Sequence, residues 1–327
     1  MRPELLHDLQ TKSDAGWIFR AGRLFSEQPD KWMELQKTPA YVELCGAARE
    51  QAPRCQELPP SQLRAATETI LMSDGAPAGL QWLEESGGLR ALLPELHATV
   101  NFSQEADRRH KDVWEHTKQV VWQAVPRPAV RWAALLHDIG KVKTRTFTDD
   151  GKVHFHRHSE VGARMFDDIS RRFRFERDTS RTLRFLILHH LRPNQYVESW
   201  TDSAVRRFER EMGSYLPDLV DLSRADITSR RPGKRQQGLG NLDALARRID
   251  GVRAADAVQP PLPGGIGDAI MVRFRLPPSR LIGDLKRSLE AEIVAGELEP
   301  YMDSSYYLPH VERLMEKLPT APCICQE

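Results

Sequence analysis

The apolar residues of this chain recur at helical spacing over most of its length. In "SQLRAATETILMS" (61–73) and "AGLQWLEESGGLRALLPEL" (78–96), apolar positions lie three or four residues apart, and Gly or Pro ends each pattern. One segment differs. In "TRTFTDDGKVHFHRH" (144–158), alternating residues flank Asp-Asp-Gly, which is typical of a β-hairpin. The pattern predicts a mainly α fold with one small hairpin.

Proline-rich segments divide the helical pattern. "QELPPS" (56–61) lies inside the N-terminal helical part, and "AVQPPLPGGIGD" (257–268) separates a C-terminal part. The predicted organisation is an N-terminal helical region at 1–104, a central domain at 105–256 and a C-terminal helical tail at 257–327.

Composition narrows the class of protein without assigning a function. Of the 327 residues, 40% are apolar and 28% charged, and the formal net charge is +1, so bulk charge gives no argument for nucleic acid or a membrane. No apolar run reaches membrane-spanning length, and the N-terminus lacks the apolar core of a signal peptide. Few cysteines fit a reducing compartment, so we expect a cytoplasmic protein that does not bind membranes. We interpret the Cys323-Ile-Cys325 tail as ordinary thiols rather than metal ligands.

Candidate chemistry appears at the end of the apolar helix "WAALLHDIGKVKTR" (132–145). His137 and Asp138 are neighbours there, and neighbouring helical residues point about 100° apart, so both can contact one ion from adjacent directions. Further ligands must come from other helices, and His116 and Asp226 are suitable candidates. Imidazole together with carboxylate suits divalent transition ions.

The same carboxylate can bridge to a second ion. His158 and one of His189 and His190, with a slight preference for His189, are candidates to hold it. Two ions roughly 3.5–4 Å apart would activate a water and clamp a phosphoryl group. Lys141, one helical turn beyond His137, can neutralise a phosphate oxygen. Taken singly, such histidines are more often structural.

Several segments together resemble a known superfamily. "HKDVWEHT", "ALLHDIGK", "HFHRHSEVGA", "WTDSAVRRF" and "RADI" occur in the order found in HD-domain metal-dependent phosphohydrolases. They resemble most the HD-containing C-terminal half of bacterial tRNA nucleotidyltransferases, the CCA-adding enzymes, and their poly(A) polymerase relatives. The flanking segments "RAGRLFSEQPDKW" (20–32) and "PLPGGIGDAIMVRFRLPPSRLIGDLKRSLEAEIVAGELE" (261–299) resemble the neck and tail of those enzymes.

This resemblance implies a helical bundle and a set of ligands for one or two divalent ions. The implied ligands of one ion are His116, His137, Asp138 and Asp226. His158, His189 and His190 match the positions of extra histidines in two-metal members. Mn, Ni, Fe, Zn and Mg all remain open as the metal.

The sequence departs from that family in one respect. Its nucleotidyltransferase head needs a Gly-rich turn beside paired carboxylates, but Gly-Gly occurs only at 87–88 and 264–265, neither beside an Asp-x-Asp pair. Little chain precedes the neck-like segment. We therefore expect that this polypeptide alone does not add CCA.

The resemblance implies a phosphatase or 2′,3′-cyclic phosphodiesterase that acts on nucleotides or RNA ends through a metal-activated water. Residues 141–235 contain 21 Lys and Arg against 14 Asp and Glu, a local excess of 7 positive charges, although such arginines are often ordinary solvated surface. Arg145 and Arg192 are the further candidates for phosphate contacts. His154 and His156 are expected to be surface residues without a role.

The alternative is a non-catalytic module that binds tRNA or pairs with a separate nucleotidyltransferase. The oligomeric state stays open.

Overall fold

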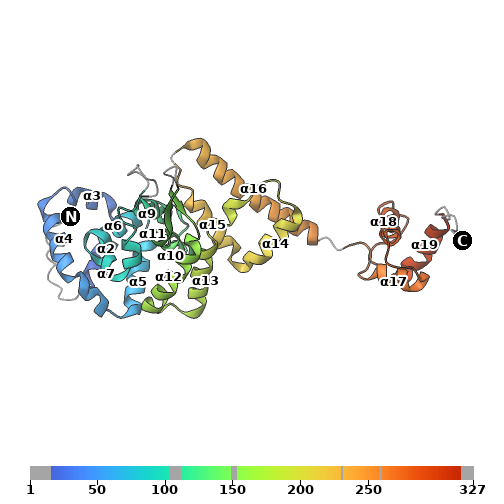
Figure 1. Ribbon diagram of the computed structural model, residues 1–327, viewed down its shortest axis with the longest axis horizontal. Helices are drawn as coiled ribbons and strands as arrows, with labels where there is room; N and C mark the ends of the chain where they lie inside the picture. The colour runs from blue at the N-terminus through green and yellow to red at the C-terminus, as the bar shows by residue number, and fades with distance from the viewer. Residues whose placement is uncertain (1–15, 104–111, 149–152, 230, 258–259, 318–327) are drawn as a thin grey trace. The chain divides into compact units, whose positions relative to one another are not determined.

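The chain forms two compact units, Met1–Asp250 and Gly251–Glu327, which are described separately. The computed structural model describes residues 16–103, 112–148, 153–229, 231–257 and 260–317. Over these residues nearly all regular structure is helical (Figure 1), so the predicted mainly α fold is confirmed. The predicted region boundaries at 104/105 and 256/257 stay predictions. The Cys-Ile-Cys tail lies outside the described residues.

The first part of unit 1 is a group of short helices built around α2. They are α2 (Trp17–Glu27), α3 (Pro29–Leu35), α4 (Pro39–Gln51), the 3₁₀ helix η1 (Ala52–Glu57), α5 (Pro60–Leu71), α6 (Ala76–Glu85), α7 (Gly88–Leu92) and α8 (Pro94–His97). Helices α2 and α6 lie so close together that a Cβ on Gly79 would be only 2.7 Å from the carbonyl oxygen of Gly22. The buried Trp82 indole also donates to the Ile18 carbonyl at 2.7 Å. Small residues thus set this helix spacing.

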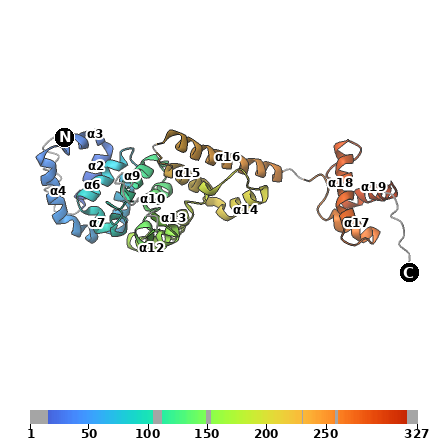
Figure 2. The same ribbon diagram turned by 45° about the horizontal axis from the view of Figure 1, so that its top comes forward.

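The second part of unit 1 surrounds the apolar helix that ends in His-Asp. Its helices are α9 (Val113–Gln123), α10 (Pro128–Leu136), α11 (Lys141–Thr144), α12 (His158–Phe173), α13 (Arg177–His189), η3 (Pro193–Gln195), α14 (Asp202–Met212), η4 (Gly213–Tyr215) and α15 (Leu216–Asp226). All side chains of α10 from Val130 to Leu136 are buried. Helix α10 packs against α9, α13 and α15 (Figure 2) and is therefore the centre of this part.

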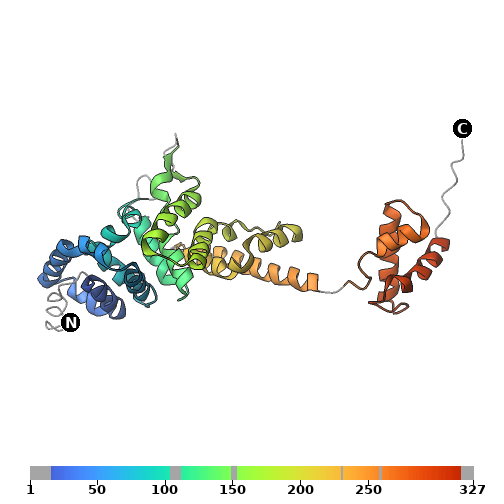
Figure 3. The ribbon, with the colours of Figure 1, turned by 90° about the horizontal axis from the view of Figure 1, so that it is seen from below.

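The predicted hairpin is present as two short antiparallel strands, β1 (Arg145–Phe147) and β2 (Val153–Phe155). Arg145 pairs with Phe155, and Phe147 pairs with Val153. The predicted Asp-Asp-Gly turn lies outside the described residues. The strands project away from the neighbouring helices (Figure 3), so that one end of the hairpin is joined to the domain and the other reaches outward.

A buried arginine connects the two parts of unit 1. Arg131, on α10, is 4% exposed and donates to the carbonyl oxygens of Ala124, Leu71 and Ser73 at 2.8, 2.7 and 3.2 Å. A buried guanidinium needs such partners, and these carbonyls satisfy it. The central helix is therefore held to the end of α5 by hydrogen bonds as well as by apolar packing.

Unit 2 has its own apolar core. Its helices are α17 (Ile266–Phe274), α18 (Arg280–Val294) and α19 (Ser304–Lys317), and α16 (Pro232–Ala257) runs across the boundary between the units. Residues from all three helices form the core, including Ile270, Leu285 and Tyr307. Nowhere in the described parts of the chain is a helix both long and apolar enough to cross a bilayer.

The turn after α10 requires a glycine. A Cβ on Gly140 would lie 2.0 Å from the carbonyl oxygen of His158 and 2.6 Å from the amide nitrogen of Gly162. Both atoms belong to the backbone of α12, so no change of rotamer can relieve the overlap. The absence of a side chain at 140 lets the His137-Asp138 turn lie directly against the start of α12.

We predict that Gly140→Ala lowers the free energy of unfolding by about 1–3 kcal/mol, the usual cost of overpacking, because α12 must move away. Gly46→Ala is the matched control. Gly46 lies inside α4, and a Cβ there would meet no neighbouring atom within 4 Å, so alanine should raise stability by roughly 0.5–1 kcal/mol. Denaturant titration measures both changes, and a Gly140→Ala protein as stable as wild type would contradict the close-approach argument.

Candidate metal centre

Six potential ligands meet where several helices of unit 1 begin or end. His116 lies on α9. His137 and Asp138 follow the last residue of α10, and His190 follows the last residue of α13. The remaining two are His158, the first residue of α12, and Asp226, the last residue of α15.

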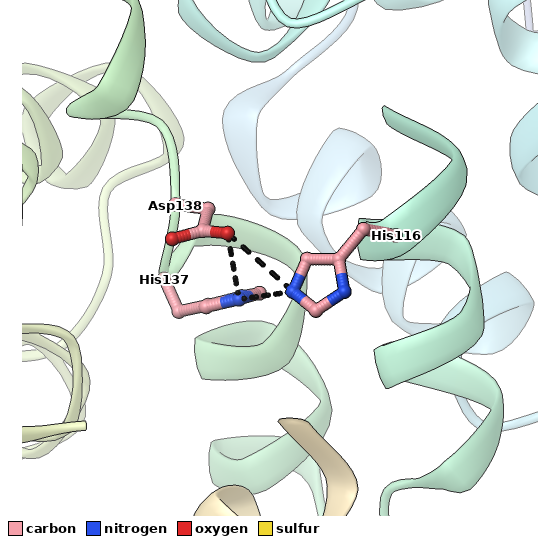
Figure 4. Close-up of side chains that lie close together, drawn as sticks. All are labelled: His116, His137 and Asp138. Atoms are coloured by element: carbon pink, nitrogen blue, oxygen red, sulfur yellow. Dashed lines mark hydrogen bonds and ion pairs between the residues drawn. The ribbon is translucent and has the colours of Figure 1, made fainter. Parts of the chain in front are cut away.

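The first group of donor atoms consists of His116, His137 and Asp138 (Figure 4). The Nε2 atoms of the two histidines are 3.3 Å apart and lie 3.5 and 3.2 Å from Oδ2 of Asp138. Oδ1 of Asp226 lies 3.0 Å from Nε2 of His116 and 3.5 Å from Nε2 of His137. These four side chains therefore converge, as the sequence predicts for one ion.

The second group consists of Asp138, His158 and His190. The Nε2 atoms of the two histidines are 3.2 Å apart. Oδ1 of Asp138 lies 3.5 Å from Nε2 of His158 and 4.0 Å from Nε2 of His190. The two oxygens of one buried carboxylate thus face two different pairs of histidines.

Backbone carbonyls three residues earlier orient three of the four histidines. Nδ1 of His137, His158 and His190 lies 2.8 Å from the carbonyl oxygens of Ala134, Phe155 and Ile187, respectively. A carbonyl can only accept, so each Nδ1 carries the hydrogen and each Nε2 points into the centre. Metal-binding histidines usually make this kind of outer hydrogen bond. Nδ1 of His116 instead lies 3.0 Å from the Thr228 hydroxyl.

This hydrogen-bonding pattern fits a cation between the histidines. With Nδ1 protonated in both His158 and His190, the neutral rings direct two bare Nε2 lone pairs at each other across 3.2 Å. Facing lone pairs repel, and a cation between them converts the repulsion into two bonds. The residues present therefore suit divalent ions: His116, His137, Asp138 and Asp226 would hold one, and Asp138, His158 and His190 would hold a second.

Electrostatics differ between the two groups. Burial lowers the pKa of His137, but the adjacent Asp138 and Asp226 carboxylates outweigh it and raise the pKa to about 10. Burial raises the pKa of both carboxyls, but the neighbouring histidines, with Lys141 beside Asp138, hold both well below the usual range. Burial lowers the pKa of His158, and it lowers that of His190 to about 4. Without metal, the first group holds a proton at neutral pH and the second does not.

The three predicted phosphate-binding side chains differ in position. Nζ of Lys141 lies 2.6 Å from Oδ2 of Asp138, so this ammonium is at the centre. The Arg192 guanidinium pairs with Glu211 at 2.7 Å. The Arg145 guanidinium lies over aromatic rings of the hairpin region. A phosphate contact by either arginine stays a prediction.

The sequence-based preference for His189 over His190 as the histidine that faces the metal centre is wrong. His190 is 1% exposed and its Nε2 faces His158, whereas the His189 ring packs on Phe185 with centroids 4.3 Å apart. The side chain at the end of α13 turns outward, and the next residue turns inward. Sequence reasoning also missed Thr228 and Gly140, of which only the glycine in "HDIG" leaves a visible signal. His154 and His156, expected at the surface, stack on each other with centroids 5.2 Å apart.

Comparison with known proteins places this centre in a family. Residues 113–231 match the family model described as HD domain. The chain is 30% identical over 270 residues to the A-adding tRNA nucleotidyltransferase of Deinococcus radiodurans, covering 79% of this chain and 59% of that protein. It is 35% identical over 174 residues to the CC-adding tRNA nucleotidyltransferase of Thermus thermophilus, covering 51% of this chain and 39% of that protein.

The protein thus contains an HD domain, of the metal-dependent phosphohydrolase superfamily type. That domain is related to the one in bacterial tRNA nucleotidyltransferases, and the resemblance predicted from the sequence is confirmed. The matched part spans 59% or less of the length of these two relatives.

We predict that binding of an ion to the first group releases about one proton at neutral pH, because the raised pKa of His137 means that Nε2 must lose its proton. Apparent affinity should then rise about tenfold per pH unit from pH 7 until it levels off near pH 10. In the metal-free protein, protonation of His137 contributes stability that is complete below pH 6.5, its ordinary pKa, and is lost as pH rises through about 10.

Calorimetry in buffers of different ionisation enthalpy measures the released protons. The second group provides the comparison, since His158 and His190 are already neutral at pH 7 and should release none. Pairing each titration with the His137→Ala variant identifies the source of the proton. Binding to the first group without proton release at pH 7 would contradict the prediction.

Proposed function

We propose that this protein is a metal-dependent phosphohydrolase of the phosphatase or 2′,3′-cyclic phosphodiesterase type, acting on nucleotides or RNA ends. The observation that carries the proposal is the division of Asp138 between two histidine pairs, with Oδ2 facing His116 and His137 and Oδ1 facing His158 and His190. His116 and His137 stabilise the charged carboxylate even without metal, but burial keeps His190 uncharged, so charge pairing does not explain why a second pair of histidines faces Oδ1. A carboxylate that holds two ions accounts for both pairs.

When bound, the ions would lower the pKa of a water and neutralise charge on the phosphoryl group. The chain supplies the rest. Carbonyl hydrogen bonds fix the histidine rings before substrate arrives, so little reorganisation is needed. Lys141 lies beside Asp138 and is 12% exposed, which supports a role for its ammonium as a donor to a phosphate oxygen at the centre. No serine or cysteine nucleophile is required.

The basic excess around the centre gives weaker support for an RNA substrate than the sequence suggested. Several of its arginines pair with acids on the surface: Arg171 with Asp168, Arg184 with Asp167, Arg192 with Glu211, and Arg224 with Asp243. Such exposed pairs are ordinary solvated surface. Two other observations support nucleotides or RNA ends as substrates: the Lys141 ammonium at the centre, and the similarity to tRNA nucleotidyltransferases.

A second candidate function is a non-catalytic module that binds tRNA or a separate nucleotidyltransferase. The extent of the similarity favours it: the alignment of 270 residues continues well outside the HD domain at 113–231. The complete donor set favours the hydrolase. Both functions can belong to one protein, so tRNA affinity and hydrolysis should be measured separately.

We predict that His137→Ala combined with Asp138→Ala lowers kcat/KM by more than about 100-fold, beyond the cost of losing an outer hydrogen-bond partner, because both groups lose a ligand. The assay measures phosphate release and ring opening with 2′,3′-cyclic, 2′- and 3′-phosphates, on mononucleotides and on matching RNA ends, with Mn, Ni, Fe, Zn and Mg in turn. Metal content and circular dichroism are recorded for each variant. Retained turnover by the folded double variant would exclude this site.

Adjacent histidines provide a matched control. His190→Ala removes an inward Nε2 and should reduce turnover and bound metal, whereas His189→Ala removes an outward ring that packs on Phe185 and should change neither. Equal effects of the two substitutions would contradict the assignment. If no metal binds and no substrate turns over, the binding module becomes the better account.

A further inference from the structure

A row of cationic and aromatic side chains leads from the metal centre along the hairpin. Its inner end is Lys141, whose Nζ lies 2.6 Å from Asp138 Oδ2 and 5.6 Å from the centre of the Phe155 ring. Phe155 is also coupled to the centre through its backbone, because its carbonyl accepts from Nδ1 of His158. The hairpin is therefore joined to the centre by two separate contacts.

The row continues outward along the strands. The Phe155 ring lies 6.3 Å from that of Phe102, and the Arg145 guanidinium lies 4.6 Å from the Phe102 ring centre and 5.1 Å from that of Phe147. Arg145 thus lies within cation–π distance of both rings, which leaves its charge beside Phe147. Phe147 is 59% exposed, so much of this large apolar side chain is in contact with water.

The strand register places these residues on one face of the hairpin. Arg145 and Phe147 alternate with Thr146 along β1, and their partners across the ladder are Phe155 and Val153. Thr146 pairs with His154 on the opposite face. We call the set Phe102, Arg145, Phe147 and Phe155 the aromatic face. Its members come from both strands and from the segment before α9, so the grouping is a feature of the fold.

We propose that the aromatic face stacks the nucleobase of the substrate while the phosphate of that substrate lies at the metal centre. The inference rests on the proposed phosphohydrolase function and specifies what its substrate must carry. An exposed ring with a cation on one side suits a base, which stacks on the ring, and a phosphate, which the cations attract. Free nucleotides and RNA ends share this chemistry.

Charge distinguishes this occupant from an apolar protein partner. An apolar protein surface that covered Phe147 would also remove the neighbouring Arg145 guanidinium from water without neutralising it, which is costly. A phosphate of a nucleotide or RNA strand neutralises this guanidinium while the base covers the ring. Phe155, the innermost ring of the face, lies 5.6 Å from Lys141 Nζ, so the face begins beside the metal centre.

The test compares Phe147→Ala with Thr146→Ala, which changes the opposite face of the same strand. Three ligands are used: adenosine 2′,3′-cyclic phosphate, a short single-stranded RNA with the same terminus, and that RNA with an abasic terminal nucleotide. KM and kcat are measured with metal, and Kd is measured by displacement of a labelled RNA from the full chain in EDTA. Phe147→Ala should raise KM and Kd about tenfold for ligands with a base, the size expected for one lost stack, and leave kcat unchanged.

Phe147→Tyr should restore both constants, and Thr146→Ala should change neither. An equal loss on mononucleotide and RNA that is absent from the abasic RNA supports stacking of the terminal base. A loss confined to RNA, with or without its terminal base, supports stacking of a base within the strand. No effect of Phe147→Ala on any ligand, or a loss on the mononucleotide that persists unchanged on the abasic RNA, overturns the inference. Absence of all hydrolysis would refute the proposed function, and the Kd measurements would still decide for or against the aromatic face.

Discussion

The arrangement of unit 1 depends on one buried carboxylate, that of Asp138, whose two oxygens face different pairs of histidines. Asp138 is 3% exposed, and its two oxygens face histidines from four different helices or helix ends. An isolated carboxylate in this position would be strongly destabilised, so the surrounding imidazoles and the Lys141 ammonium are a requirement of folding as well as of chemistry. The helices that supply those groups must end where they do, because their termini are what meet around Asp138.

The helix ends and the ligand geometry are products of the same hydrogen bonds. A helix leaves its last carbonyls without partners, and at the ends of α10 and α13 a histidine Nδ1 takes one of them. That bond satisfies a carbonyl at the helix end, selects the tautomer and directs Nε2 inward. Gly140 then allows α12 to come close enough for His158 to join. The centre is thus assembled from short-range backbone interactions, and the apolar packing of α10 fixes where they occur.

The sequence alone predicted the features that depend on the spacing of apolar residues and on the order of motifs along the chain. Helical spacing predicted the mainly α fold, alternation around Asp-Asp-Gly predicted the hairpin, and the order of the histidine and aspartate motifs predicted the family. It could not separate His189 from His190, because adjacent residues diverge by about 100° and the final turn of α13 decides which one is buried. It also missed Thr228 and the carbonyl partners, since a hydroxyl is common and a backbone acceptor has no residue identity. The excess of positive charge was visible, but its pairing with acids on neighbouring elements was not.

Helix α10 is buried on every side between Val130 and Leu136. It therefore has no solvent-facing stripe that could absorb a change in register. One inserted or deleted residue would rotate everything after it by about 100° and shift it by about 1.5 Å, which would carry His137 and Asp138 away from both histidine pairs. Conservative substitutions along α10 alter the packing only slightly, whereas the insertion or deletion of one residue moves the ligands out of the site. In descendants of this sequence, insertions and deletions should accumulate in the connections between helices and be purged from α10.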